Sequence, residues 1–133
     1  MDIVYQCDRR PEVSEIVELH AAAQLRRPRE HERVARMYEA SPIVWSARAG
    51  ERLVGILRGW TDGGFDGYVC DLAVHPEYQR QGIGRELLGH CVAAHSSEVQ
   101  WVLRASIIAA RYYEHIGWQR IENGWCWRAT VRR

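Results

Sequence analysis

The chain has 133 residues, of which 26% are charged and 47% hydrophobic, and its formal net charge is +1. This length fits a single domain with one hydrophobic core, which we assign to residues 1–133. A net charge so close to zero gives no long-range attraction toward nucleic acid or anionic lipid, so neither is expected as a partner.

The first third of the chain predicts one strand and two helices. Segment 2–7, DIVYQC, is rich in β-forming residues and precedes a turn that ends at Pro11. Apolar residues at helical spacing predict helices over 11–23 and 30–40. His20 lies on the first helix and is expected at the edge of the core or on the surface. The arginines at 26, 27 and 29 predict a solvated loop, or a surface selecting acidic or phosphorylated acceptors if a site lies nearby.

The rest of the chain predicts a hairpin followed by strands and helices in alternation. The strands are expected over 43–47, 52–61, 68–74, 99–105, 118–121 and 125–131, and the helices over 84–95 and 107–116. This order predicts an α/β (α+β) fold, with a mixed, mainly antiparallel sheet of about seven strands and about four helices on its faces.

The cysteines predict neither a metal site nor a disulfide framework. They lie far apart, at Cys7, Cys70, Cys91 and Cys126, without a C-x-x-C pair or a paired histidine spacing. We expect them to be reduced. No charged leader with an apolar run and no apolar segment of membrane-spanning length is found, so we expect a cytoplasmic protein with no membrane partner.

Segment 74–89, VHPEYQRQGIGRELLG, has the pattern of a backbone cradle for phosphate. A strand ends at a proline, two glycines flank one isoleucine, and an amphipathic helix follows. A helix start has unpaired N–H groups and a partial positive charge, and glycines let a phosphate approach them. Arg80 and Arg85 could add charge-assisted contacts. The alternative is a tight turn that needs glycine only for its geometry.

Segment 105–118, ASIIAARYYEHIGW, contains two adjacent tyrosines on a short helix. Consecutive helical residues point about 100° apart, so Tyr112 and Tyr113 cannot serve one site equally. A phenol with a pKa of about 10 is a suitable acid for a leaving thiolate. The alternative is that both rings pack at the edge of the core.

Together, these two segments resemble the GNAT superfamily of acyl-CoA-dependent N-acyltransferases. The family pattern is Arg or Gln, two free positions, Gly, one free position, then Gly or Ala, and Gln79, Gly82 and Gly84 match it. YYEHIGW is similar to the family's tyrosine-bearing helix. DLAVHPEYQRQGIG is also loosely similar to a small branch that includes plastid-type serotonin acetyltransferases.

The resemblance implies a binding site for acetyl-CoA as co-substrate, with no metal. It assigns the pyrophosphate to the backbone of Arg80, Gln81, Gly82, Ile83, Gly84 and Arg85, after Gln79. Main-chain groups of Leu72, Ala73 and Val74 would bind the pantetheine and polarise the thioester carbonyl. Tyr113 would protonate the departing thiolate. Ser106 takes the place of an asparagine that contacts the cofactor, or it caps the helix.

The attacking amine must lose a proton, and Asp71 is the candidate base because its strand would lie beside the cofactor. Asp71 shares a strand face with Ala73, and its alternative role is structural. Asp66 and Glu114 are weaker candidates for the base. Cys70 as an acyl-carrying nucleophile is weaker still, because no histidine is placed to activate it.

The expected function is N-acetyl transfer to a primary amine in a ternary complex, with a small-molecule acceptor. Trp60, Phe65, Trp125 and Trp127 would suit an apolar or aromatic amine. The alternatives are a non-catalytic acyl-CoA-binding or regulatory module and a protein N-terminal or lysine acetyltransferase. A homodimer could form through the C-terminal segment WCWRATVRR.

Overall fold

The computed structural model describes residues 2–131. In chain order the elements are β1 (Ile3–Gln6), α1 (Val13–Ala22), α2 (His31–Glu39), β2 (Ile43–Ala49), β3 (Arg52–Thr61), β4 (Asp66–Val74), the 3-10 turn η1 (Pro76–Tyr78), α3 (Ile83–Ala93), β5 (Gln100–Leu103) and α4 (Ala110–His115). The chain forms two compact units, one ending at Leu103 and one beginning at Arg104.

The first unit is built on a mixed sheet with the strand order β1-β2-β3-β4-β5. The first three pairs are antiparallel, whereas β4 and β5 are parallel and connected through α3. The predicted α/β class with a mixed, mainly antiparallel sheet is confirmed. The predicted count of about seven strands is too high, because the sheet has five among the described residues.

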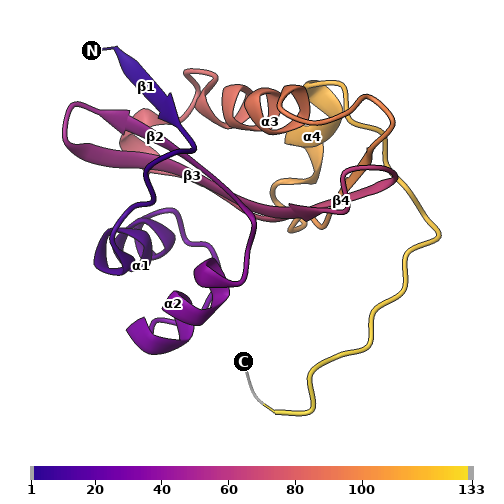
Figure 1. Cartoon of the computed structure of the whole chain (residues 1–133), viewed down its shortest axis with the longest axis horizontal. Helices are drawn as coiled ribbons and strands as arrows, with labels where there is room; N and C mark the ends of the chain where they lie inside the picture. The colour runs from indigo at the N-terminus through magenta and orange to yellow at the C-terminus, as the bar shows by residue number, and fades with distance from the viewer. Residues whose placement is uncertain (1, 132–133) are drawn as a thin grey trace. The chain divides into compact units, whose positions relative to one another are not determined.

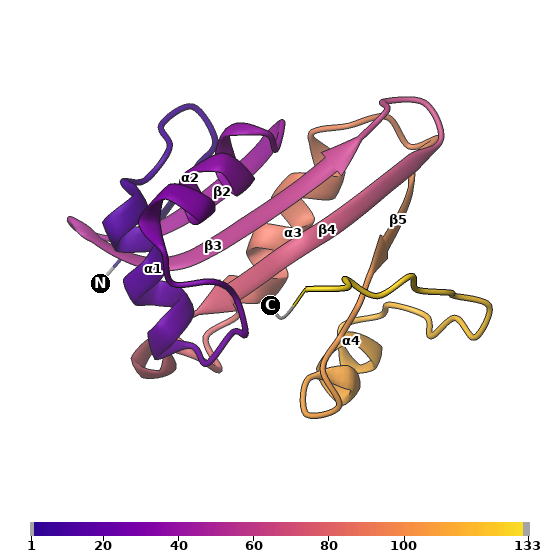
Figure 2. The same ribbon diagram turned by 90° about the horizontal axis from the view of Figure 1, so that it is seen from below.

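Helices cover both faces of this sheet, with α1 and α2 on one face and α3 on the other (Figures 1 and 2). Accordingly, β2 and β3 are buried along most of their length. The core beneath α1 and α2 consists of Ile16, Leu19, Val34, Tyr38, Val44, Leu53, Ile56 and Ala73. On the other face α3 buries Ile83, Leu87, Leu88 and Cys91. No helix in the described part of the chain is long and apolar enough to cross a membrane.

The second unit contains α4, followed by a segment without a strand as far as residue 131. The strands predicted over 118–121 and 125–131 are therefore absent. The alternation of Trp125, Trp127 and Val131 is typical of a half-buried strand, but a strand forms only against a partner backbone. In this segment Trp125 is 98% and Trp127 94% exposed, so the alternating pattern is present but no neighbouring strand among residues 2–131 hydrogen-bonds to it.

Gly67 tests how tightly β4 packs against β5. A Cβ at Gly67 would lie 2.5 Å from Cε3 of Trp101, and a packed indole ring cannot move aside cheaply. We expect Gly67→Ala to lower the free energy of unfolding by about 1–3 kcal/mol, measured by chemical denaturation. Gly64→Ala is the control, because a Cβ at Gly64 meets nothing within 4 Å. Equal stability of the two variants would contradict this packing.

Candidate functional site

The two edges of β4 differ at Cys70. Toward β3, Arg58 pairs with Asp71 and Gly59 pairs with Val69, so Cys70 is the extra residue of a β-bulge. Toward β5, the ladder ends where Val69 pairs with Leu103. Beyond that point the main chain of residues 70–74 has no register partner on β5. This stretch is where the sequence predicted that Leu72, Ala73 and Val74 offer main-chain groups to a ligand.

The loop that follows β4 is held at its base by bonds from neighbouring elements. The His75 N–H donates to the Val54 carbonyl (2.8 Å), and Nε2 of Gln79 donates to the Val74 carbonyl (3.1 Å). Arg52 at the start of β3 binds Glu77 (2.9 Å). The side chain of Gln79, predicted to belong to the cofactor site, thus fixes the loop to the end of β4.

The turn into α3 has a backbone that only glycine adopts easily. Gly82 precedes the helix with φ 82°, and Arg80 also has a positive φ of 65°. A Cβ built at Gly82 would meet nothing within 4 Å, so the space before the helix start is open. Arg80, Gln81 and Arg85 are exposed around it, whereas Ile83 and Gly84 are buried. Free N–H groups, open space and two cations suit a phosphate.

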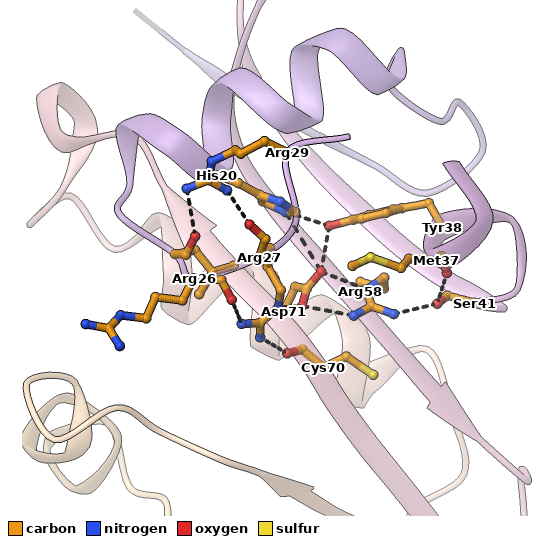
Figure 3. Close-up of polar contacts among 11 residues, drawn as sticks. His20, Arg26, Arg27, Arg29, Met37, Tyr38, Ser41, Arg58, Cys70 and Asp71 are labelled. Atoms are coloured by element: carbon orange, nitrogen blue, oxygen red, sulfur yellow. Dashed lines mark hydrogen bonds and ion pairs between the residues drawn. The ribbon is translucent and has the colours of Figure 1, made fainter. Parts of the chain in front are cut away.

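Asp71 is the centre of a buried polar cluster between β4 and the helices α1 and α2 (Figure 3). Its Oδ1 accepts from Nε of Arg27 (2.6 Å) and from Nη2 of Arg58 (3.1 Å). Its Oδ2 accepts from Nε of Arg58 (2.7 Å) and from the Tyr38 hydroxyl (2.9 Å). The side chain is 1% exposed, and both of its oxygens are occupied.

The hydrogen-bond order in this cluster fixes the tautomer of His20. A carboxylate only accepts, so the Tyr38 hydroxyl gives its proton to Asp71 and must accept from Nε2 of His20, 3.0 Å away. His20 therefore carries a proton on Nε2, and among residues 2–131 its buried Nδ1 has no hydrogen-bond partner. Burial lowers the pKa of His20 to about 4, although Asp71 opposes that shift.

These surroundings favour the structural role for Asp71 over the predicted role of base. Burial by itself raises the pKa of this carboxyl, but hydrogen bonds and charge from Arg58 and Arg27 outweigh it and lower the pKa. Burial and the negative charge of Asp71 together raise the pKa of Tyr38. The expected face is confirmed, since Asp71 and Ala73 alternate with more exposed neighbours along β4.

Tyr113 and Ser106 belong to the second unit. The ring of Tyr113 packs edge-on against Trp118, with 6.3 Å between centroids, and burial raises its pKa to about 12. Its hydroxyl is therefore protonated throughout the physiological range. The Ser106 hydroxyl accepts from the Ala109 N–H (3.2 Å), which is the capping contact that was its alternative prediction. Glu114, a weaker base candidate, pairs with Arg120.

Sequence reasoning missed most of the cluster around Asp71. His20 was expected at the edge of the core or on the surface, and Arg27 in a solvated loop or on a surface that selects acidic or phosphorylated acceptors. No polar role was predicted for Tyr38. Only Arg58 left a usable signal, because it lies opposite Asp71 in the antiparallel register of β3 and β4. Among the described residues, no group of three or more His, Cys, Asp and Glu side chains is arranged to hold a metal ion.

The sequence and the fold are similar to those of known proteins. Residues 40–120 match the family model of the acetyltransferase (GNAT) domain. The structure resembles a probable acetyltransferase from Staphylococcus aureus (TM-score 0.82, 21% identity, 96% of this chain and 99% of that one). It also resembles a GNAT family acetyltransferase from Streptococcus pneumoniae (TM-score 0.77, 23% identity, 98% of this chain and 100% of that one). An aminoglycoside N-acetyltransferase in complex with CoA is similar in structure as well (TM-score 0.68, 12% identity, 98% of this chain and 95% of that one). No curated protein matches the sequence significantly.

The buried neutral His20 makes stability depend on pH. Its folded pKa of about 4 is below the ordinary value, so the unfolded chain binds the extra proton as pH falls below 6.5. The full contribution is present above pH 6.5, and we expect a loss of about 3 kcal/mol of unfolding free energy by pH 4. The charged groups that act on His20 are Asp71, Arg27, Arg29 and Arg58.

Denaturant titrations at a series of pH values measure this dependence. His20→Gln removes the titrating ring, and its pH profile should be flatter than that of the wild type over the same window. Identical profiles for the two proteins would show that His20 is not the group responsible.

Proposed function

The chain belongs to the GNAT acetyltransferase family, and we propose that it transfers an acetyl group from acetyl-CoA to a primary amine within a ternary complex. The observation that carries this proposal is the open, glycine-lined turn before α3, beside the part of β4 that has no partner on β5. The similar aminoglycoside acetyltransferase in complex with CoA supports it.

The first unit would bind the donor. Acetyl-CoA supplies the acetyl group as a reactive thioester. The N–H groups at the start of α3, with Arg80 and Arg85, bind its pyrophosphate. Main-chain groups of Leu72, Ala73 and Val74 orient the pantetheine and polarise the thioester carbonyl, an effect that is strongest where water is excluded.

Tyr113 would act as the general acid. The amine nitrogen bonds to the acetyl carbon, the carbon–sulfur bond breaks, and the Tyr113 hydroxyl gives its proton to the sulfur. The proton that the nitrogen sheds as the amide forms passes through water and restores the Tyr113 hydroxyl. Because four hydrogen bonds occupy Asp71, we assign that carboxylate to positioning. The acceptor then reacts as the free amine, after its proton has passed to water.

The acceptor is proposed to be a small molecule with an apolar or aromatic body. Trp60 and Phe65, at the end of β3 and in the loop before β4, are 48% and 71% exposed. Exposed aromatic faces attract ammonium groups and stack on rings.

Calorimetry with CoA tests the donor site. At Gly82→Ala we expect the dissociation constant for CoA to rise about tenfold, because the new Cβ enters the phosphate space and the backbone loses its left-handed turn. Gly63→Ala is a matched control, since Gly63 has a similar φ of 80° and a Cβ there also meets nothing within 4 Å. Equal affinity of the two variants would contradict the cradle.

Release of free CoA thiol across a broad panel of amines tests the reaction. We expect turnover with at least one amine, and Tyr113→Phe should lower kcat about tenfold. Tyr112→Phe is the control, because it removes the neighbouring hydroxyl but keeps the ring that packs edge-on against Tyr113, with 5.3 Å between centroids. Full activity of Tyr113→Phe would remove this residue from the mechanism. CoA binding without transfer to any amine, peptide or protein would indicate a non-catalytic binding module. Transfer to proteins alone would show that the acceptor is a protein and not a small molecule.

A further inference from the structure

One guanidinium group joins the loop between α1 and α2 to the bulge of β4. Nε of Arg27 donates to Oδ1 of Asp71 (2.6 Å), and Nη2 donates to the Cys70 carbonyl (2.8 Å). Nη1 of the same group donates to the Arg26 carbonyl within the loop (2.7 Å). All three nitrogens are therefore used, and Figure 3 shows the group between Asp71 and Cys70.

The loop is ordered enough for this contact to be specific. Arg29 donates to the carbonyls of Leu25 (3.2 Å) and Arg27 (2.9 Å), so a second guanidinium closes the loop on itself. The Leu25 N–H donates to the His20 carbonyl (2.9 Å) at the end of α1. Arg27 thus projects from a defined loop.

Neutralising Asp71 does not by itself account for Arg27. Arg58 already binds both carboxylate oxygens, at 2.7 and 3.1 Å, and matches the charge of Asp71. What Arg27 adds is the bond to the Cys70 carbonyl. A bulge residue is left out of the regular ladder, so this carbonyl needs a donor from outside the sheet.

That carbonyl sits directly before the main chain that the proposed reaction uses. A peptide group is planar, so fixing the Cys70 carbonyl also fixes the direction of the Asp71 N–H. The next peptide groups, from Leu72 to Val74, continue directly from this point and lie in register with β3. A small rotation at Cys70 would misdirect the groups expected to polarise the thioester.

We propose that Arg27 is a positioning residue for acyl transfer, which holds the bulge of β4 in its productive geometry with Asp71 as its anchor. The inference rests on the proposed function and explains why a buried carboxylate on β4 takes two arginines. It predicts that Arg27 affects the chemical step more than donor binding, because the turn before α3 makes no contact with it in the described hydrogen bonds.

The test compares Arg27→Ala with Arg26→Ala, which removes the same charge from the neighbouring position. The Arg26 side chain is exposed and points away from Asp71 in Figure 3. For Arg27→Ala we expect kcat to fall about ten- to a hundredfold while the CoA dissociation constant changes less than about twofold. Millimolar methylguanidinium should restore part of the rate. Arg26→Ala should behave as the wild type and gain nothing from methylguanidinium.

Two further measurements keep the outcome decisive. Arg27→Lys keeps a charge near Asp71 but cannot reach two acceptors as a fork, so its kcat should lie between those of the wild type and Arg27→Ala. Amide hydrogen exchange should be about tenfold faster over residues 24–30 and 70–74 in Arg27→Ala, with α3 unchanged.

Wild-type kcat in folded Arg27→Ala would overturn the proposal, as would unchanged exchange over 70–74. A lower melting temperature with unchanged kcat per folded molecule would make Arg27 a stability residue only and would also overturn it. If the wild type transfers acetyl to no amine, the proposed function fails, and the exchange experiment still decides whether Arg27 holds the bulge.

Discussion

The buried charge of Asp71 is the constraint on which the α1–α2 side of the sheet depends. Moving a carboxylate out of water costs several kcal/mol, and the protein offsets this with two guanidinium groups and a phenol. Those partners come from β3, from α2 and from the loop after α1. Removing Asp71 would leave Arg58, whose side chain is only 15% exposed, without its counter-charge, a loss of about 3–5 kcal/mol by analogy with buried pairs. One side chain therefore fixes the distance between the helix layer and the strand.

On the opposite face, close apolar packing joins α3 to the sheet. Gly55 lies beneath the first turns of α3, where an added Cβ would be 3.0 Å from Cγ2 of Ile83 and 3.1 Å from Cδ1 of Leu87. This close approach seats the start of α3 directly on β3. The open turn at Gly82 is thus attached to a rigid base, as a site for a doubly charged ligand requires. Apolar packing under α3 and polar bonds at the base of the loop together position the turn at Gly82, whereas the other face adds an ionic cluster to its apolar core.

The sequence predicted what depends on short-range pattern. The helices at α1, α2 and α3, the β2–β3 hairpin and the glycine turn follow from periodicity and from residues that favour turns. The cluster around Asp71 could not be predicted, because it joins positions 20, 27, 38 and 58, whose approach depends on helix rotation and strand register. The strands expected over 118–131 fail for a related reason. Alternation of Trp125 and Trp127 specifies a face, but a strand also needs a neighbour, and no local pattern provides one.

In β4, the side chains pack the fold, and the main chain is the part proposed to contact the ligand. Asp71 and Ala73 belong to the buried face of β4, toward the α1–α2 layer, while the main chain of residues 70–74, beyond the end of the β5 ladder, is the stretch that we propose for the donor. Side chains on such a strand influence chemistry only through the direction of its peptide groups. By the same reasoning, our proposal assigns the effect of Arg27 on the reaction rate to its bond with the Cys70 carbonyl.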